Sequence, residues 1–136
     1  MNASACVLDT DVVIAALDRS DTHHLNAARA ITAMIEEGIP LLLSLINYAE
    51  TLVRPAEDEQ TLRTARDALT GLGIQLIAPT PAIAVNAARH RKLNISLADG
   101  FALATAQAHE ASLASFDGRV RRALPKVGLQ LTPQLS

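Results

Sequence analysis

The chain has 136 residues, of which 49% are hydrophobic but only 2% aromatic, and its formal net charge is −2. This length can bury one core without disulfides, so we predict a single domain over residues 1–136. No apolar run approaches the roughly 20 residues that span a bilayer, and no secretory signal pattern opens the chain. The single cysteine forms neither an internal disulfide nor a zinc motif. Together these features favour a cytoplasmic protein without membrane contact.

The first half of the chain alternates short apolar runs with helical patterns. ACVLD at 5–9 predicts a buried strand, and 11–17 predicts the helix that follows it. A longer amphipathic helix is expected near 22–37, where a glycine ends it. LLLS at 41–44 predicts a second buried strand, and the next helix runs to about Val53, before a proline stops it.

The middle of the chain continues this alternation. A helix is predicted over 57–70, followed by the strand IQLIA at 74–78. Two prolines then introduce a helix over roughly 82–92. An alanine-rich helix begins near Ser96 and runs to about His109.

The last predicted strands are ASLAS at 111–115 and VGLQL at 127–131. Strands of about five residues that alternate with helices are typical of an α/β protein. We therefore predict a three-layer α/β/α fold with a mainly parallel central sheet of about five strands. No repeat or linker interrupts the chain.

Four acidic residues occupy positions where a parallel sheet is expected to bind ligands, which is outside the carboxyl ends of its strands. Asp9 ends the first strand, and Asp117 follows the fourth. Glu50 lies on the apolar stripe of the helix in "SLINYAETLV", and Asp99 lies on the apolar stripe of the alanine-rich helix, so we expect both to face inward. The four carboxylates are therefore predicted to converge at one edge of the sheet.

Structural explanations exist for each of these acids. Asp9 or Asp11 can cap the helix that follows the first strand. Asp99 lies three residues after Ser96, which matches the spacing of a capping box. Asp117 and the glycine after it form a common turn pair.

Glu50 can form an ion pair with Arg54, four residues later, although such a pair contributes little when exposed. The coincidence of four acids at one edge is harder to explain in this way. Clustered carboxylates raise one another's pKa values unless a cation is bound. Oxygen ligands without Cys or His predict Mg²⁺ or Mn²⁺, ions that can activate water and stabilise the leaving oxygen of a phosphodiester.

With these acids in place, the sequence resembles the PIN-domain nucleases, and among them the VapC-type toxins of bacterial toxin–antitoxin pairs. "VLDTDVVIAAL" is similar to the opening strand of the family with its first metal-binding acid, here Asp9. "SLINYAETLV" is similar to the second block, with Glu50 as its acid. "LADGFALATAQAHEASLASFDGRV" is similar to the third and fourth blocks, with Asp99 and Asp117, so the resemblance covers nearly the whole chain.

Two positions depart from the family pattern. Asp11 stands where the family usually has Ser, Thr or Asn, so this fifth carboxylate is either an extra ligand or a helix cap. Ser115 stands where Thr is frequent, two residues before the last acid. The hydroxyl is retained, and we expect it to support the metal ligands without binding the ion itself.

The resemblance implies a Mg²⁺-dependent endoribonuclease toxin, with Mn²⁺ as the alternative ion, that a cognate antitoxin inhibits by blocking the acidic pocket. It also implies a homodimer and complexes in which the antitoxin, rather than the toxin, contacts DNA. Asp9 and Asp99 would hold the principal ion. Glu50 and Asp117 would complete its shell, position a second ion or orient the attacking water.

Positive charge is concentrated toward the end of the chain. Residues 1–88 carry five basic and eleven acidic side chains, whereas residues 89–136 carry seven basic and three acidic ones. This asymmetry favours a polyanionic partner such as RNA, although two solvated faces would give the same counts. The candidate ligands for RNA phosphates are Arg89, Arg91, Lys92, Arg119, Arg121 and Arg122.

Three alternative functions remain open at this point. "LDTDVV" also fits the opening motif of haloacid-dehalogenase-type phosphatases, with Asp9 as nucleophile and Asp11 as general acid, but a suitably placed lysine is missing. A phosphoacceptor receiver domain would need an aspartate at the end of the third strand, which "IQLIAPT" lacks. A PIN-like module could bind partners without catalysis, and the four intact acids argue against it.

Overall fold

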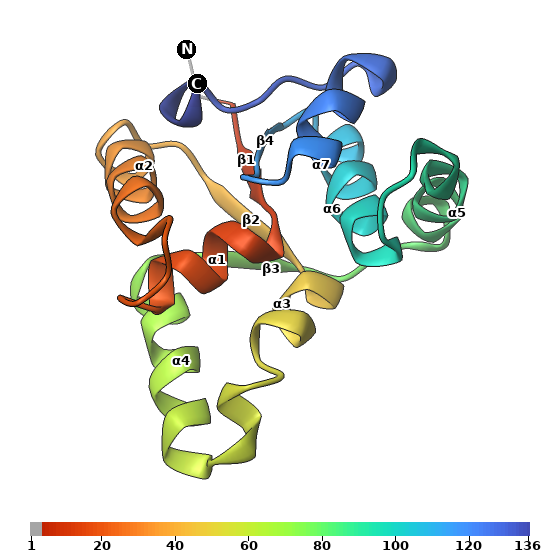
Figure 1. The fold of residues 1–136 in the computed structure, drawn as a ribbon. Helices are drawn as coiled ribbons and strands as arrows, with labels where there is room; N and C mark the ends of the chain where they lie inside the picture. Colours follow the sequence, from red (N-terminus) through yellow and green to blue (C-terminus); the bar gives the residue numbers. More distant parts are fainter. Residues whose placement is uncertain (1–3) are drawn as a thin grey trace.

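The computed structural model describes residues 4–136 and places a parallel sheet between helices on both of its faces (Figure 1). The strands follow the spatial order β3-β2-β1-β4, and every pairing is parallel. This confirms the predicted α/β fold. The predicted domain range also includes residues 1–3, which lie outside the described residues. The four strands are β1 (Cys6–Leu8), β2 (Leu41–Ser44), β3 (Gln75–Ile77) and β4 (Ser112–Ala114).

Helices occupy most of the chain between these strands. None of the helices within residues 4–136 is both long enough and apolar enough to cross a membrane. The α-helices are α1 (Thr10–Leu17), α2 (His24–Glu36), α3 (Leu45–Thr51), α4 (Glu59–Gly71), α5 (Pro81–Arg89), α6 (Leu97–Ala108) and α7 (Gly118–Ala123). The short 3₁₀ helices are η1 (Pro55–Glu57), η2 (His90–Leu93), η3 (Leu124–Val127) and η4 (Pro133–Leu135).

Successive residues of β1 face opposite layers of the fold. Cys6 and Leu8 pack into a core that α1, α2 and α4 share, whereas Val7 packs into a second core with α6 and α7. This alternation is what a strand buried on both faces requires. Because all four strands are parallel, their carboxyl ends meet at one edge, and the segments that leave the sheet begin there.

The predicted fifth strand is reduced to a single parallel bridge between Leu113 and Leu131. Part of the predicted segment belongs to η3, and Gly128 follows it with a φ of 73°, in the left-handed region that extended strands do not use. Two hydrogen bonds hold the chain beside β4: Leu113 N–H donates to the carbonyl oxygen of Gln130, and Thr132 N–H donates to that of Leu113.

Helices α5 and α6 approach each other closely at Gly100. A Cβ atom at this position would lie 2.7 Å from the carbonyl oxygen of Ala87 on α5. Ala87 and Ala104, which line the same contact, are also small and buried. The contact fixes the start of α6, and with it the position of the neighbouring Asp99.

Replacing Gly100 by alanine is expected to destabilise the protein by about 1–3 kcal/mol, because the added methyl group would overlap the carbonyl oxygen of Ala87. Gly71, at the end of α4, is the matched control, since a Cβ atom there meets nothing within 4 Å. Gly71→Ala should be neutral or stabilise by up to about 1 kcal/mol. Urea unfolding of both variants measures the difference, and equal stabilities would contradict the prediction.

Candidate metal-binding and nuclease site

Asp9 lies at the carboxyl end of β1 and is only 2% exposed. Its N–H group still extends the sheet, because it donates to the carbonyl oxygen of Ala114 at 2.9 Å. Its Oδ1 accepts a hydrogen bond from the N–H of Thr10 at 2.9 Å and so caps α1. Its Oδ2 accepts one from the hydroxyl of Ser115 at 2.9 Å. The carboxylate is therefore held from two segments that are distant in the sequence.

The surroundings of Asp9 disfavour its charge. Burial raises the pKa of this carboxyl well above its usual value, and the negative charges of Asp11 and Asp99 raise it further. The hydrogen bonds from Ser115 and Thr10 act in the opposite direction, because they stabilise the ionised form. A cation beside Asp9 would favour the ionised form and lower this pKa.

Asp11 reaches the loop that follows β4. Its Oδ2 accepts a hydrogen bond from the N–H of Phe116 at 3.0 Å, while its Oδ1 is buried without a partner among the described residues. Burial is the main cause that raises the pKa of Asp11, and the charges of Asp117 and Asp99 add to it. The alternative in which Asp11 caps α1 is not supported, because Asp9 provides the cap. An unpartnered buried oxygen is costly unless a ligand satisfies it.

The loop after β4 carries two further candidates. Ser115 is fully buried, and its hydroxyl both donates to Asp9 and accepts from the N–H of Asp117 at 3.1 Å. Asp117 is exposed and caps α7, since its Oδ1 accepts from the N–H groups of Arg119 and Val120 at 2.8 and 3.1 Å. The hydroxyl of Ser115 therefore contacts Asp9 directly, and the carboxylate of Asp117 caps a helix.

Asp99 begins α6 and forms the predicted capping box with Ser96. The hydroxyl of Ser96 accepts from the N–H of Asp99 at 3.0 Å, and the Oδ2 of Asp99 accepts from the N–H of Ser96 at 3.4 Å. The side chain is half-buried. Its negative charge raises the pKa values of both Asp9 and Asp11, so these three acids share one electrostatic environment.

Glu50 is linked to this group through Thr10, the residue after Asp9. The hydroxyl of Thr10 donates to the Oε1 of Glu50 at 2.6 Å, and it accepts from the side-chain amide of Asn47 at 3.0 Å. The same amide donates to the carbonyl oxygen of Ala98, which precedes Asp99, at 3.2 Å. Side chains from α1 and α3 and the backbone of α6 are thus joined by one hydrogen-bond network.

The expectation that Glu50 lies on the inward face of its helix is wrong. Glu50 is exposed, and Ile46 and Val53 on the same stripe are 37% and 67% exposed. The buried face of α3 instead carries Asn47 and Thr51. Hydrogen bonds offset part of this burial, because the hydroxyl of Thr51 donates to the carbonyl oxygen of Asn47, and the side-chain Nδ2 of Asn47 donates to Thr10 and Ala98.

Sequence reasoning missed Thr10 and Asn47. Asn47 is fully buried, and its Oδ1 has no partner among the described residues. A signal was present, because Asn47 and Thr51 lie four residues apart and form a polar stripe on α3. The amphipathic pattern used for α3 places apolar residues on the buried face, so it predicts that the polar stripe of Asn47 and Thr51 faces solvent.

The predicted acids lie around one edge of the sheet, but their side chains do not form a complete set of metal ligands. Within residues 4–136, no three His, Cys, Asp or Glu side chains are close enough together to hold a metal ion on their own. The donors are nevertheless all oxygen atoms, two carboxyls have raised pKa values, and one buried oxygen of Asp11 lacks a partner. This chemistry fits a hard divalent cation that keeps several of its water ligands.

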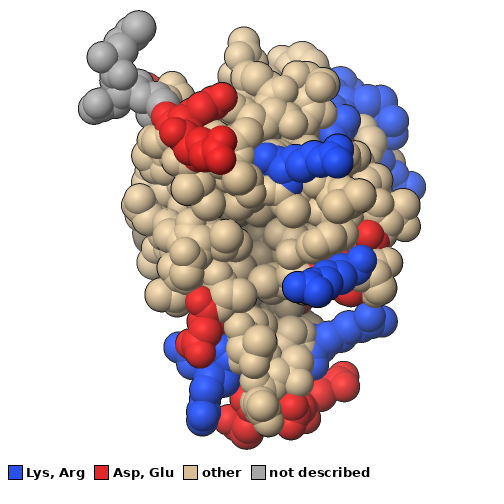
Figure 2. Space-filling view, turned by 90° about the vertical axis from the view of Figure 1, so that its left-hand side faces the viewer, with Lys and Arg blue, Asp and Glu red and all other residues tan. Residues whose placement is uncertain are grey.

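The six basic candidates lie on two separate segments, and the structure brings one of them to the acids. Arg121 donates from its Nε to the carbonyl oxygen of Ser115 at 2.7 Å. Arg91 donates to the carbonyl oxygen of Ile95, at the start of the loop before α6. On the face drawn in Figure 2, basic side chains gather along the upper right edge, and acidic and basic groups mix at the lower tip. Arg89, Arg91 and Lys92 belong to α5 and η2, and Arg119, Arg121 and Arg122 belong to α7.

The chain is similar to a known family in sequence and to solved proteins in structure. The family model described as PIN domain matches residues 6–124. Among curated proteins, no sequence is significantly similar to this chain. A toxin–antitoxin complex from Klebsiella pneumoniae contains a similar chain, with 27% identity over 89% of this chain and 93% of that chain, and a TM-score of 0.70.

Two further solved structures share the fold at lower identity. VapC20 from Mycobacterium tuberculosis, described as a sarcin–ricin loop cleaving toxin, is 17% identical over 88% of this chain and 95% of its own, with a TM-score of 0.69. VapBC2 from Rickettsia felis, bound to a DNA fragment from its promoter, contains a chain that is 14% identical over 93% of this chain and 96% of its own, with a TM-score of 0.72.

Without divalent cations, the free energy of unfolding should fall as the pH rises above about 4. Unfolded carboxyls lose their protons near this pH, whereas Asp9 and Asp11 keep theirs to higher pH in the folded chain. Stability is therefore highest while both are protonated, and the loss is complete above their folded pKa values. Asp18 and Asp58 have the opposite effect at lower pH. Because hydrogen bonds lower their pKa values in the folded chain, the stability that they contribute is lost as the pH falls below about 4.

Asp9→Asn should flatten this decline, because asparagine can still cap α1 but carries no charge. Asp67→Asn, at an exposed position on α4, is the control and should leave the decline unchanged. Urea unfolding in EDTA from about pH 4 to pH 8 measures the effect. A decline as steep in Asp9→Asn as in the unaltered protein would contradict the assignment.

Proposed function

This chain belongs to the PIN domain family, and on that premise we propose that it is a VapC-type toxin, a metal-dependent endoribonuclease. The observation that carries the proposal is the buried carboxyl of Asp9, whose pKa is raised by its burial and by the charges of Asp11 and Asp99. Grouped acids with perturbed pKa values are typical of catalytic sites. The similar toxin from Mycobacterium tuberculosis, which cleaves the sarcin–ricin loop, supports a nuclease activity.

Mg²⁺ or Mn²⁺ is the proposed cofactor. Asp9 and Asp99 would hold the principal ion, and Glu50 and Asp117 would complete its shell or orient the attacking water. The unpartnered Oδ1 of Asp11 is an additional ligand in this proposal. A bound ion of this kind activates water and stabilises negative charge on a phosphodiester.

The protein's own contribution is to hold these carboxylates in place before RNA binds. The hydroxyl of Ser115 fixes one oxygen of Asp9, and the hydroxyl of Thr10 fixes one oxygen of Glu50. Such supporting hydrogen bonds orient the ligands of metal sites and increase their affinity. Arg121, which contacts the carbonyl oxygen of Ser115, is the basic candidate best placed to bind an RNA phosphate near the acids.

The family match favours the nuclease over the phosphatase alternative. In the phosphatase interpretation, Asp11 would donate a proton to the leaving group. One oxygen of Asp11 instead accepts a hydrogen bond from the N–H of Phe116, and the other is buried. The network around Asp9 also favours catalysis over a module that only binds partners, because a binding surface gains nothing from a buried carboxyl with a raised pKa.

We also propose the partners that the family resemblance implies: a cognate antitoxin, a second copy of the chain in a homodimer, and DNA contacted only through the antitoxin, in the cytoplasm. The complexes from Klebsiella pneumoniae and Rickettsia felis support the antitoxin and the DNA. Exposed apolar side chains, among them Leu45 and Ile46 on α3 and Val53 just after it, give such partners a surface to cover.

Asp9→Asn and Asp99→Asn are each expected to reduce Mg²⁺-dependent cleavage of single-stranded RNA by about a hundredfold or more, because each removes a charged ligand of the ion. Both variants should remain folded by circular dichroism. Asp67→Asn, which changes an exposed acid on α4, should cleave like the unaltered protein. Cleavage that survives in both Asp9→Asn and Asp99→Asn would overturn the proposal.

Asp11→Asn separates the nuclease from the phosphatase. The nuclease proposal expects reduced but measurable RNA cleavage, because asparagine keeps an oxygen for the N–H of Phe116. The phosphatase interpretation requires complete loss of activity and a phosphoenzyme that beryllofluoride mimics. Hydrolysis of a phosphate monoester by the unaltered protein that is lost in Asp11→Asn, without any RNA cleavage, would support the phosphatase.

A further inference from the structure

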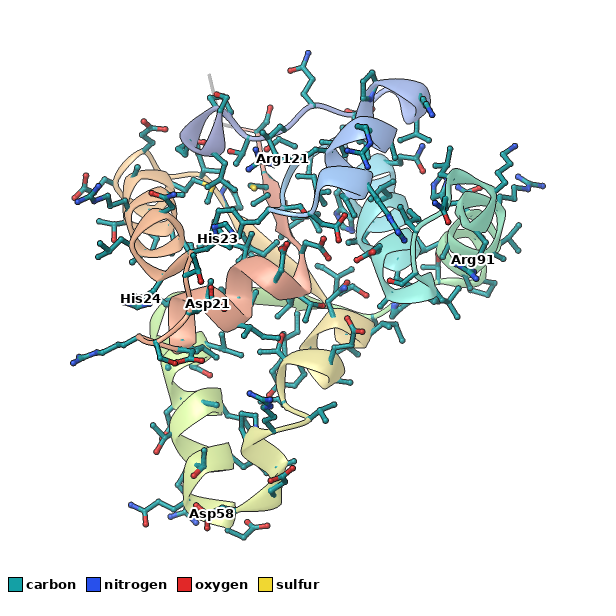
Figure 3. All side chains as sticks on the ribbon, viewed as in Figure 1. Asp21, His23, His24, Asp58, Arg91 and Arg121 are labelled. Carbon is teal, nitrogen blue, oxygen red and sulfur yellow. The ribbon has the colours of Figure 1, made fainter. Side chains whose placement is uncertain are left out.

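A hollow of about 410 Å³ lies between α2, α7 and η4, beside the loop that follows β4. His23, Asn26 and Arg29 line it from the start of α2, and Phe116 and Arg121 line it from the segment after β4. Figure 3 shows the labelled side chains of His23 and Arg121 in the space between α2 and α7. Of these residues, only Arg121 was among the sequence-based candidates for RNA binding.

An aromatic stack forms part of the wall of this hollow. The rings of His23 and Phe116 are stacked, with centroids 4.3 Å apart and planes inclined by 10°. The chain contains only two phenylalanines, one tyrosine and no tryptophan, so one of its few aromatic side chains is placed beside the acids. His23 is exposed, whereas Phe116 is half-buried. A planar group on the outer side of His23 would therefore extend an existing stack.

The charged side chains of this hollow are both arginines. Among residues 4–136, Arg29 and Arg121 line it and no Asp or Glu does so, while Ser136, the last residue, lines it as well. The larger groove between α1, α3 and α4 differs, because Asp18 and Glu50 line it beside Arg54. Arginine presents a planar fork of N–H donors that matches phosphate oxygens. Cationic groups beside an aromatic stack are the combination that binds single-stranded nucleic acid.

The hollow and the acidic site share the loop after β4. Phe116 contributes its ring to the stack and its N–H to the carboxylate of Asp11. Arg121 donates to the carbonyl oxygen of Ser115, whose hydroxyl donates to Asp9. A ligand in the hollow would therefore lie within one residue of groups that contact the candidate catalytic acids.

We propose that this hollow binds one nucleotide of a single-stranded RNA substrate, adjacent to the phosphodiester that is cleaved. The base stacks on His23, which Phe116 supports from behind, and Arg29 and Arg121 bind the phosphate. The proposal rests on the ribonuclease function proposed above and adds the residues that position the substrate beside the acids. His23 and Arg29 act as positioning residues for the strand.

The test measures RNA affinity separately from cleavage. In an Asp9→Asn background, which prevents cleavage, fluorescence anisotropy follows binding of a labelled single-stranded RNA of about 12 nucleotides with randomised sequence. His23→Ala and Arg29→Gln should each weaken binding by about fivefold or more. His109→Ala and Arg63→Gln remove the same groups from exposed positions on other parts of the surface, and they should change affinity by less than about twofold.

A second measurement locates the nucleotide. With Asp9 intact, His23→Ala should raise KM for RNA cleavage while kcat changes little, because the ring binds substrate without taking part in the chemistry. When single abasic nucleotides are scanned along an RNA of defined sequence, one position next to the cleavage site should weaken binding. That penalty should disappear in His23→Ala, since the stacking partner is already absent.

The outcomes separate this proposal from the function on which it rests. Unchanged affinity, KM and abasic profile in His23→Ala and Arg29→Gln, with cleavage that still depends on Asp9, would overturn the nucleotide site alone. RNA binding that depends on His23 and Arg29 in a protein without any ribonuclease activity would overturn the function and retain the site. If His109→Ala and Arg63→Gln weaken RNA binding as much as His23→Ala and Arg29→Gln do, the loss reflects the general charge of the surface. That result would also overturn the nucleotide site.

Discussion

The burial of the Asp9 carboxyl is the constraint on which the arrangement of this edge of the sheet depends. An ionised carboxylate in a protein interior costs several kcal/mol unless hydrogen bonds or opposite charges compensate for it. The fold supplies two hydrogen bonds, one from the first residue of α1 and one from the loop after β4. These donors join the beginning of the chain to its last strand. They leave the repulsion from Asp11 and Asp99 uncompensated, and that deficit is what a divalent cation would remove.

Structural and functional explanations of the acids do not exclude each other here. Asp9, Asp99 and Asp117 lie at the N-terminal ends of α1, α6 and α7, where each accepts hydrogen bonds from backbone N–H groups. Helix N-termini carry a partial positive charge and stabilise anions. The same positions therefore keep three carboxylates in place without a metal and present them at a common edge. A cap requires one carboxylate oxygen, so the second oxygen remains for another contact, as it does for Ser115 at Asp9.

The order of strands and helices was predictable from the sequence because buried parallel strands and capped helices have strong local patterns. Asp9 and Asp117 could be placed for the same reason, since Asp9 directly follows β1 and Asp117 lies in the short loop after β4. The orientation of α3 could not be predicted, because Asn47 is buried through hydrogen bonds with Thr10 and Ala98, which are far away in the sequence. The last predicted strand failed for a local reason, the left-handed backbone of Gly128. Hydrophobic patterning does not detect either effect.

The loop between β4 and α7 performs a different task at each of three consecutive residues. The hydroxyl of Ser115 holds Asp9, the N–H of Phe116 holds Asp11, and the carboxylate of Asp117 starts α7. An insertion or deletion here would put all three groups out of register at once, so the length of this loop is constrained as strictly as the residue types at Ser115 and Asp117. Divergence in substrate preference among related chains is then expected at the opposite wall, where side chains such as His23 and Arg29 can be exchanged independently of the acids.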